Sequence, residues 1–197
     1  MLSLFWKTKP SPKSNSWWNT GLTEAERSTI DAAFQPLGNI SASSLIESGS
    51  PNSIGNLVSN LKKEPLRQLG YKLLHHADTL ISEKTPVLDV HFYWASRGEY
   101  YYRWRDLDQG ALDEAVKSFQ QQIGFATIAL KFFQDDKNWG FVPAHKGFHQ
   151  LRIIEEKRGN LTLARALCEE AKSQGWTDDW DKHITRIDKK IAKQAAN

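Results

Sequence analysis

Hydrophobic positions along most of this chain recur at intervals of three and four residues, the spacing of one face of an α-helix. The pattern is cleanest over residues 65–82 and 111–135, where apolar and polar side chains follow this rhythm. Residues 87–105 are so rich in aromatic side chains that periodicity alone also allows a strand, but their length favours a helix. No stretch alternates for long like a strand, so the sequence predicts an all-α fold.

Residues that begin and end helices divide the first part of the chain. Thr23 and Glu26 have the spacing of a capping box, in which each side chain accepts a hydrogen bond from a free backbone amide of the first turn. The helix that follows is expected to reach Phe34. Residues 38–55 are rich in turn-forming residues, and the pattern assigns no element to them.

The second part of the chain has a simpler pattern. Gly124 falls inside the helix predicted over residues 111–135, and we expect it to be tolerated at a cost of about 1 kcal/mol relative to alanine. Two further helices are predicted over residues 144–158 and 161–174. A final helix is expected to begin at Thr177, a suitable N-cap residue.

Gly159 and Asn160 separate two helices that follow each other almost directly. Glycine adopts the left-handed backbone conformation that other residues resist, so the chain can reverse tightly at this point. The second helix carries small residues at Ala164 and Ala171, which allow two antiparallel helices to approach closely. The pattern therefore predicts a helical hairpin.

This hairpin resembles a tetratricopeptide repeat, whose two helices carry aromatic, leucine and small residues at fixed positions. Phe148 and Leu151 stand at the positions of the first aromatic residue and the leucine, and Ala164 at the position of the alanine. Cys168 takes the second aromatic position and Ala171 the second small position.

The match to the family pattern is partial. Arg152 replaces the family's glycine and Glu155 replaces its tyrosine. Residues 111–119 are similar to the second half of an earlier repeat, with Ala115 and Phe119 at the alanine and phenylalanine positions. Tetratricopeptide repeats serve as scaffolds for many partners, so the resemblance implies an architecture more than an activity.

The resemblance implies a domain of antiparallel helical hairpins over residues 85–197. Its last helix, residues 178–193, is expected to be the capping helix that covers the final apolar face. Residues 17–84 are expected to form a helical N-terminal extension packed on this domain. Residues 1–16 are expected to be a flexible arm, because residues 7–16 combine proline, serine and lysine with nothing to bury.

Composition excludes some classes of protein. The chain has 40% hydrophobic and 25% charged residues, as ordinary soluble proteins do. Its net charge of +3 is too slight to indicate nucleic-acid binding without local clustering. The single cysteine excludes an internal disulfide. With no secretory signal and no apolar run of about 20 residues, the sequence predicts a cytoplasmic protein.

Two histidines have a spacing that metal sites use. His145 and His149 lie four residues apart at the start of a predicted helix, which puts both imidazoles on one face. The segment lacks the glutamate of a zincin motif, and a third ligand would have to come from Glu155, His183 or elsewhere. We therefore interpret these histidines as polar or capping residues and predict no metal and no cofactor.

The sequence offers no support for catalysis. Cys168 lies on the interior face of its predicted helix, where a thiol behaves as a small hydrophobic residue and not as a nucleophile. There is no glycine loop for phosphate and no serine elbow motif. We predict that the protein is not an enzyme, and a small metal-dependent enzyme is the third alternative.

One segment, RGEYYYRWR at residues 97–105, alternates arginines with aromatic residues. Such a pattern suits stacking on bases or binding a carboxylate. The alternative is a large helical core in which the arginines pair with nearby acidic side chains. A nucleic-acid-binding protein that uses this basic-aromatic segment is therefore the second functional hypothesis.

The first hypothesis is a protein-interaction module that holds a peptide or partner helix, carrying acidic residues, in a groove. The family resemblance implies that the first helix of each hairpin lines this groove with side chains off its buried stripe. No feature of the sequence indicates the oligomeric state. The predicted partner-binding residues are Arg97, Tyr101, Arg105, Lys146, His149, Gln150, Ile153, Glu156 and Lys157.

Overall fold

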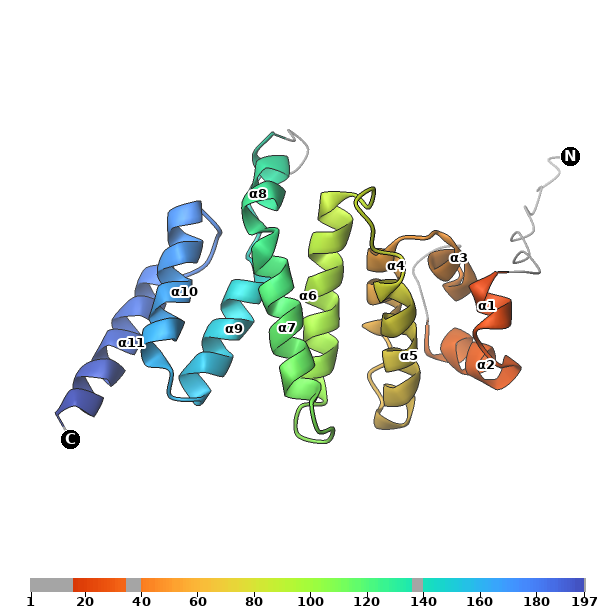
Figure 1. Ribbon diagram of the computed structural model, residues 1–197, viewed down its shortest axis with the longest axis horizontal. Helices are drawn as coiled ribbons and strands as arrows, with labels where there is room; N and C mark the ends of the chain where they lie inside the picture. The colour runs from red at the N-terminus through yellow and green to blue at the C-terminus, as the bar shows by residue number, and fades with distance from the viewer. Residues whose placement is uncertain (1–15, 35–39, 136–139, 197) are drawn as a thin grey trace, which may run out of the picture. The chain divides into compact units, whose positions relative to one another are not determined.

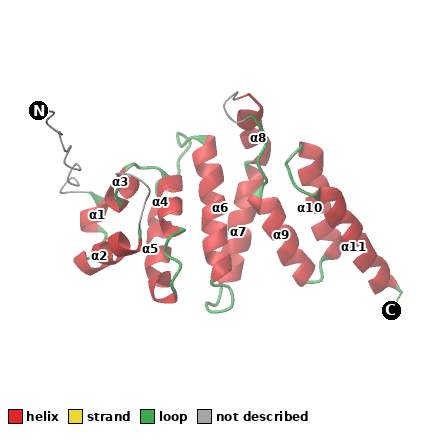
Figure 2. Ribbon diagram, turned by 180° about the vertical axis from the view of Figure 1, so that it is seen from behind, coloured by secondary structure: helices red, strands yellow, loops and turns green. Residues whose placement is uncertain are grey.

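A computed structural model of the chain describes residues 16–34, 40–135 and 140–196. The described residues form helices joined by loops, with no strand among them, which confirms the all-α prediction (Figures 1 and 2). The arm expected over residues 1–16 lies outside the described residues except for Ser16. The chain divides into two compact units, Met1–Glu83 and Lys84–Asn197, and the packing of one on the other stays a prediction.

The first unit is built from short helices. Thr23 and Glu26 form the predicted capping box, with the Thr23 amide donating to Oε2 of Glu26 at 2.7 Å. Ser41 and Ser50 cap two helices in the segment to which the sequence pattern assigned no element. The elements are α1 (Trp17–Thr20), α2 (Glu24–Ala33), α3 (Ala42–Glu47), α4 (Pro51–Val58), a 3₁₀ turn (Glu64–Leu66) and α5 (Arg67–Asp78).

The second unit contains longer helices that pack on their neighbours along the chain. Its elements are α6 (Val87–Arg103), α7 (Ala111–Gly124), α8 (Ala126–Asp135), α9 (Lys146–Lys157), α10 (Leu161–Gln174) and α11 (Trp180–Ala195). Helix α6 packs on α7, α7 on α9, α9 on α10, and α10 on α11 (Figure 1). The aromatic segment that periodicity could not assign is therefore helical.

The turn between α9 and α10 has the predicted form. Gly159 has a φ of +82°, in the left-handed region that favours glycine. The amide of Asn160 donates to the carbonyl of Glu155 at 2.9 Å, and the amide of Gly159 donates to the carbonyl of Glu156 at 3.3 Å. These two bonds form a Schellman motif, which satisfies carbonyls at the end of α9 and reverses the chain.

The prediction of one continuous helix over residues 111–135 is wrong. Helix α7 ends at Gly124, and α8 begins at Ala126. Phe125 donates its amide to the carbonyl of Gln122 at 3.1 Å, a tight turn that replaces the regular helical bond. Glycine inside a helix weakens it, and here the chain uses that position to change direction.

The expected cap of the last helix is also wrong. Helix α11 begins at Trp180, with Asp179 at the N-cap position. The hydroxyl of Thr177 instead donates to the carbonyl of Val142 at 2.6 Å, in the loop before α9. Thr177 therefore joins two connecting segments of the second unit.

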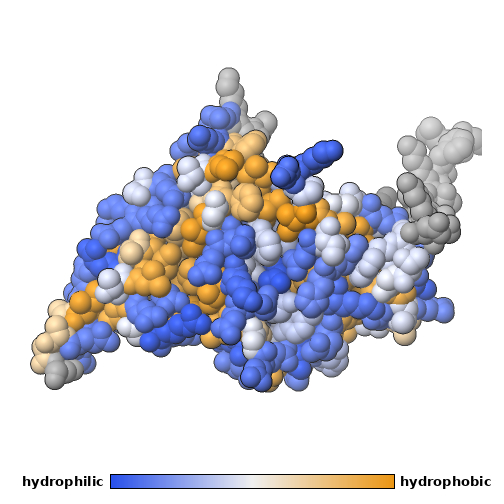
Figure 3. Space-filling view, viewed as in Figure 1, coloured by the Kyte–Doolittle hydropathy of each residue, from blue (hydrophilic) through white to orange (hydrophobic). Residues whose placement is uncertain are grey.

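Most apolar side chains of the second unit are buried, but several large ones are exposed, two of them on α8. Figure 3 shows hydrophobic side chains gathered over α8, where Ile128 and Phe132 are 49% and 47% exposed.

Within the described part of the chain, each helix is too short or too polar to pass through a lipid bilayer.

Candidate functional site

A charged groove of about 390 Å³ lies between α9 and α11. Helix α9 contributes side chains from two of its turns, and α11 contributes two basic side chains one turn apart. The lining contains four basic residues, one acidic residue and one aliphatic residue. These are Arg152, Ile153, Glu156, Lys157, Arg186 and Lys190.

Glu156 organises the basic side chains of this groove. Its carboxylate accepts hydrogen bonds from Nη1 of Arg152 at 2.6 Å and from Nζ of Lys190 at 3.0 Å. Both Nη1 and Nη2 of Arg186 also donate to it, the latter at 2.7 Å. The bidentate contact between Arg186 and Glu156 fixes the guanidinium plane, because its two parallel bonds define one geometry.

The ionisation of Glu156 follows from these contacts. Burial by itself would raise the pKa of Glu156, because its side chain is only 6% exposed. Hydrogen bonds from Arg186, Lys190 and Arg152 outweigh burial and lower the pKa of Glu156 to about 2. The carboxylate is therefore ionised at neutral pH, and it neutralises part of the positive charge around it.

The open side of the groove remains basic. The Arg186 and Lys190 side chains are 43% and 49% exposed, although both contact Glu156. Lys157 is exposed at the same groove, and Ile153 is half-buried beside it. This arrangement offers fixed cations around one aliphatic side chain, which suits a ligand with carboxylates next to an apolar group.

The structure brings only part of the predicted binding surface together. Ile153, Glu156 and Lys157 line the groove. Lys146 is exposed at the first turn of α9 and forms an ion pair with Oε1 of Glu99 at 2.9 Å. Gln150 is half-buried.

The prediction that Arg97 and Tyr101 present a binding surface needs correction, because both are buried, at 6% and 5% exposure. Nη1 of Arg97 donates to Oγ of Ser118 at 2.7 Å, and Nη2 pairs with Oε2 of Glu114 at 3.0 Å. The guanidinium carbon of Arg97 lies 4.7 Å from the centre of the Tyr101 ring. These groups hold α6 against α7. Arg97 and Tyr101 therefore follow the alternative interpretation of the basic-aromatic segment, in which it belongs to a helical core.

Arg105, the third residue of that segment, is half-buried after the end of α6. Its Nη1 donates to the carbonyl of Tyr102 at 2.8 Å, and its guanidinium carbon lies 4.2 Å from the centre of the Tyr102 ring. It also forms an ion pair with Asp106 at 3.2 Å. Arg105 is therefore engaged in local contacts and does not line the groove.

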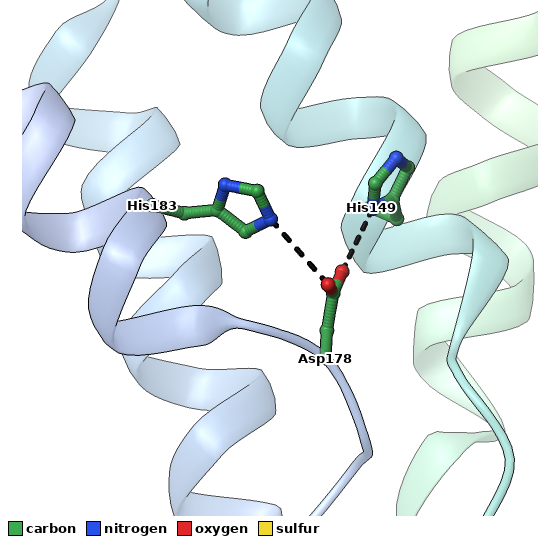
Figure 4. Close-up of side chains that lie close together, drawn as sticks. All are labelled: His149, Asp178 and His183. Atoms are coloured by element: carbon green, nitrogen blue, oxygen red, sulfur yellow. Dashed lines mark hydrogen bonds and ion pairs between the residues drawn. The ribbon is translucent and has the colours of Figure 1, made fainter.

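A second cluster lies close to the groove along the same two helices. Nδ1 of His149 on α9 is 2.8 Å from Oδ2 of Asp178, and Nε2 of His183 on α11 is 3.4 Å from Oδ1 of Asp178 (Figure 4). Asp178 belongs to the loop between α10 and α11. These nitrogen and oxygen atoms lie within 4.8 Å of one another, and the three residues are partly exposed.

The protonation of this cluster reflects burial and mutual contacts. Burial alone would raise the pKa of Asp178, but hydrogen bonds from His149 and from the Asp179 amide outweigh it and lower the pKa. Burial lowers the pKa of His183, and the positive charge of Arg152 lowers it further. At neutral pH the carboxylate is therefore ionised between two imidazoles.

His145, which the sequence paired with His149, lies apart from this cluster. It is fully buried, and Nδ1 accepts a hydrogen bond from the amide of Phe148 at 3.3 Å as the N-cap of α9. This confirms the capping interpretation. Its ring centre lies 5.0 Å from that of His91 and 4.6 Å from that of Trp176, in an aromatic part of the core.

Sequence reasoning missed several members of both clusters. Arg186 and Lys190 lie one turn apart on α11, but no motif distinguishes them from the other basic residues of that helix. No motif marks Asp178, whose place near the start of the last helix is common for an acidic residue. Glu156 and Arg186 are 30 residues apart, and no local pattern indicates that they meet.

Cys168 is fully buried, and burial raises the pKa of its thiol to about 11. Because the thiolate is the reactive form and is inaccessible, we expect a maleimide reagent to label the native protein much more slowly than the urea-unfolded protein. Mass spectrometry of timed samples measures this difference. Equal labelling rates in the native and unfolded protein would contradict the core position of Cys168.

Comparison of the chain with protein-family models, with curated proteins and with solved structures gives no match.

Proposed function

We propose that this protein is an interaction module of tetratricopeptide type, whose α9–α11 groove binds a peptide or helix that carries acidic residues. The succession of packed helices in the second unit and the turn at Gly159 support the architectural part of the proposal. The hydrogen bonds that Glu156 accepts from Arg186 and Lys190 carry the functional part, because they hold two partly exposed cations in place before any ligand arrives.

Ordered cations favour binding for a physical reason. A long basic side chain loses about 0.5–1.5 kcal/mol of conformational freedom when a ligand immobilises it. Arg186 and Lys190 have already lost much of that freedom in the unbound protein. Binding a ligand carboxylate therefore costs less conformational entropy at these two side chains. Ile153 adds an aliphatic contact for an apolar side chain between the ligand's acidic residues.

The groove suits a peptide better than a nucleic acid. Proteins that bind single strands combine basic grooves with aromatic side chains on which the bases stack. No aromatic residue is among the six that line this groove. The basic-aromatic segment that motivated the nucleic-acid hypothesis places Arg97 and Tyr101 in the core.

Fluorescence anisotropy with helical peptides that combine glutamates and leucines tests the proposal. We expect the double variant Arg186→Glu, Lys190→Glu to lose more than about tenfold in affinity, because like charges replace opposite charges at the interface. The double variant Arg186→Gln, Lys190→Gln removes the two cations without adding negative charge. It tests the same contacts in case the charge-reversal variant misfolds. Lys189→Glu, Lys193→Glu is the matched control, with the same charge change on exposed positions of α11 outside the groove.

Equal loss in the groove double variant and in the control would contradict a site in the groove, because it would indicate general electrostatic attraction. A peptide with glutamine in place of glutamate is expected to bind more weakly. If a single-stranded oligonucleotide bound more tightly than every peptide, with a steep loss of affinity on adding salt, the nucleic-acid hypothesis would replace ours.

A further inference from the structure

We propose that His149, Asp178 and His183 bind one divalent transition-metal ion, with Zn²⁺ the best match. Two imidazole nitrogens and one carboxylate oxygen form a ligand set that zinc accepts readily in proteins. The three side chains come from α9, from the loop before α11 and from α11 itself, and both imidazole rings face the Asp178 carboxylate (Figure 4).

The two measured contacts to Asp178 are close to the separations that a metal requires. Zinc bonds of about 2.0–2.2 Å in tetrahedral geometry place ligand atoms roughly 3.4 Å apart. Nδ1 of His149 lies 2.8 Å from Oδ2 of Asp178, and Nε2 of His183 lies 3.4 Å from Oδ1 of the same carboxylate. One ligand atom from each of the three residues lies within 4.8 Å of the other two. The proposal requires rotations of the imidazole rings that bring all three atoms within reach of one ion.

The surroundings of the cluster leave room for exchange with solvent. The His149 side chain is 36% exposed, and those of Asp178 and His183 are each 19% exposed. Three protein ligands leave at least one coordination position for water or for a ligand from outside, as in open zinc sites. The site is therefore accessible to an ion without unfolding.

The contacts of Asp178 with the two histidines also have an interpretation without a metal. Asp178 accepts from His149 and pairs with His183, so the trio can act as a hydrogen-bonded link between α9 and the start of α11 without a metal. The two interpretations predict different results when metal is added. The proposal concerns metal uptake alone and does not depend on the proposed peptide site.

Titration calorimetry of the full chain, without a histidine tag and after treatment with a chelator, tests the proposal with ZnCl₂. We expect uptake of one Zn²⁺ per chain, and Co²⁺ should give the absorption spectrum of a site with nitrogen and oxygen ligands. His149→Ala, Asp178→Asn and His183→Ala should each weaken Zn²⁺ binding more than about 100-fold, beyond the range for loss of an outer-shell partner. His75→Ala, an exposed histidine on α5, is the control and should leave binding unchanged.

Thermal melting provides a second readout that separates the two interpretations. Zinc is expected to raise the melting temperature of the wild type and of the His75→Ala control, because an ion that binds only the native state stabilises it. The three ligand variants should show no such rise. Absence of zinc uptake by the wild type, or equal uptake by the wild type and His149→Ala, would overturn the proposal and leave only the hydrogen-bonded link.

Discussion

The second unit is expected to lose about 4 kcal/mol of stability between pH 7 and pH 5, because two histidines are buried in their neutral form. His91 and His145 are 2% and 0% exposed. Burial lowers the pKa of His91 to about 4 and that of His145 to about 3, and the nearby His91 contributes to the second shift. Both values lie far below the ordinary histidine pKa of about 6.5.

The direction of the effect follows from proton linkage. Below about pH 6.5, His91 and His145 bind protons in the unfolded chain but stay neutral in the native state. The unfolded state therefore gains stability as the pH falls. One pH unit corresponds to about 1.4 kcal/mol per group, so at pH 5 each histidine contributes about 2 kcal/mol of destabilisation.

Urea denaturation at pH 7, 6 and 5 measures this loss. Carboxylates with lowered pKa, including Glu156 at about 2, lose their contribution only below their unfolded pKa of about 4.5, so they do not dominate this interval. His145→Asn keeps an N-cap residue and should remove about 2 kcal/mol of the pH dependence, and His91→Gln should do the same. The exposed His75→Ala is the control. An unchanged pH dependence in both core variants would contradict the assignment.

Phe119→Ala is expected to lower the free energy of unfolding of the second unit by about 3–5 kcal/mol, since it removes a fully buried aromatic ring and leaves a cavity. The ring packs where α6 and α7 approach each other. A Cβ atom added at Gly98 would lie 2.5 Å from a carbon of this ring, so no side chain separates the two. Rigid helical backbones on both sides limit how far the cavity can collapse.

Phe132→Ala is the matched control, because it makes the same change at a side chain that is 47% exposed on α8. It should change the free energy of unfolding by no more than about 0.5 kcal/mol. Urea unfolding at pH 7 measures the free energy of unfolding of both variants. One shared value is used for the slope of this free energy against urea concentration. Equal losses in the two variants would contradict the packing of α6 on α7 around the Phe119 ring.

Local patterns predicted much of the fold. Helical periodicity identified α5 and α7 because burial on one face fixes the spacing of apolar residues, whereas α6 was favoured only by the length of its segment. The capping box at Thr23 and the turn at Gly159 depend on neighbouring residues only, and both are confirmed. The break at Gly124 was missed because apolar residues continue in register on either side of it.

The candidate sites were harder to predict, because they depend on contacts between distant helices. The sequence identified Ile153, Glu156 and Lys157 on α9 but gave no sign that Arg186 would meet them. It also could not distinguish a binding arginine from a core arginine at position 97, since both functions use aromatic neighbours. The tetratricopeptide resemblance stays a prediction.

Nuclear magnetic resonance of the labelled full chain, titrated with the tightest-binding acidic peptide, tests the central claim most directly. We expect the largest shifts at the backbone amides of Ile153, Lys157, Arg186 and Lys190, which come from two helices but share one groove. Shifts centred instead on Lys189 and Lys193, or spread evenly over the basic residues of the chain, would contradict a peptide site between α9 and α11.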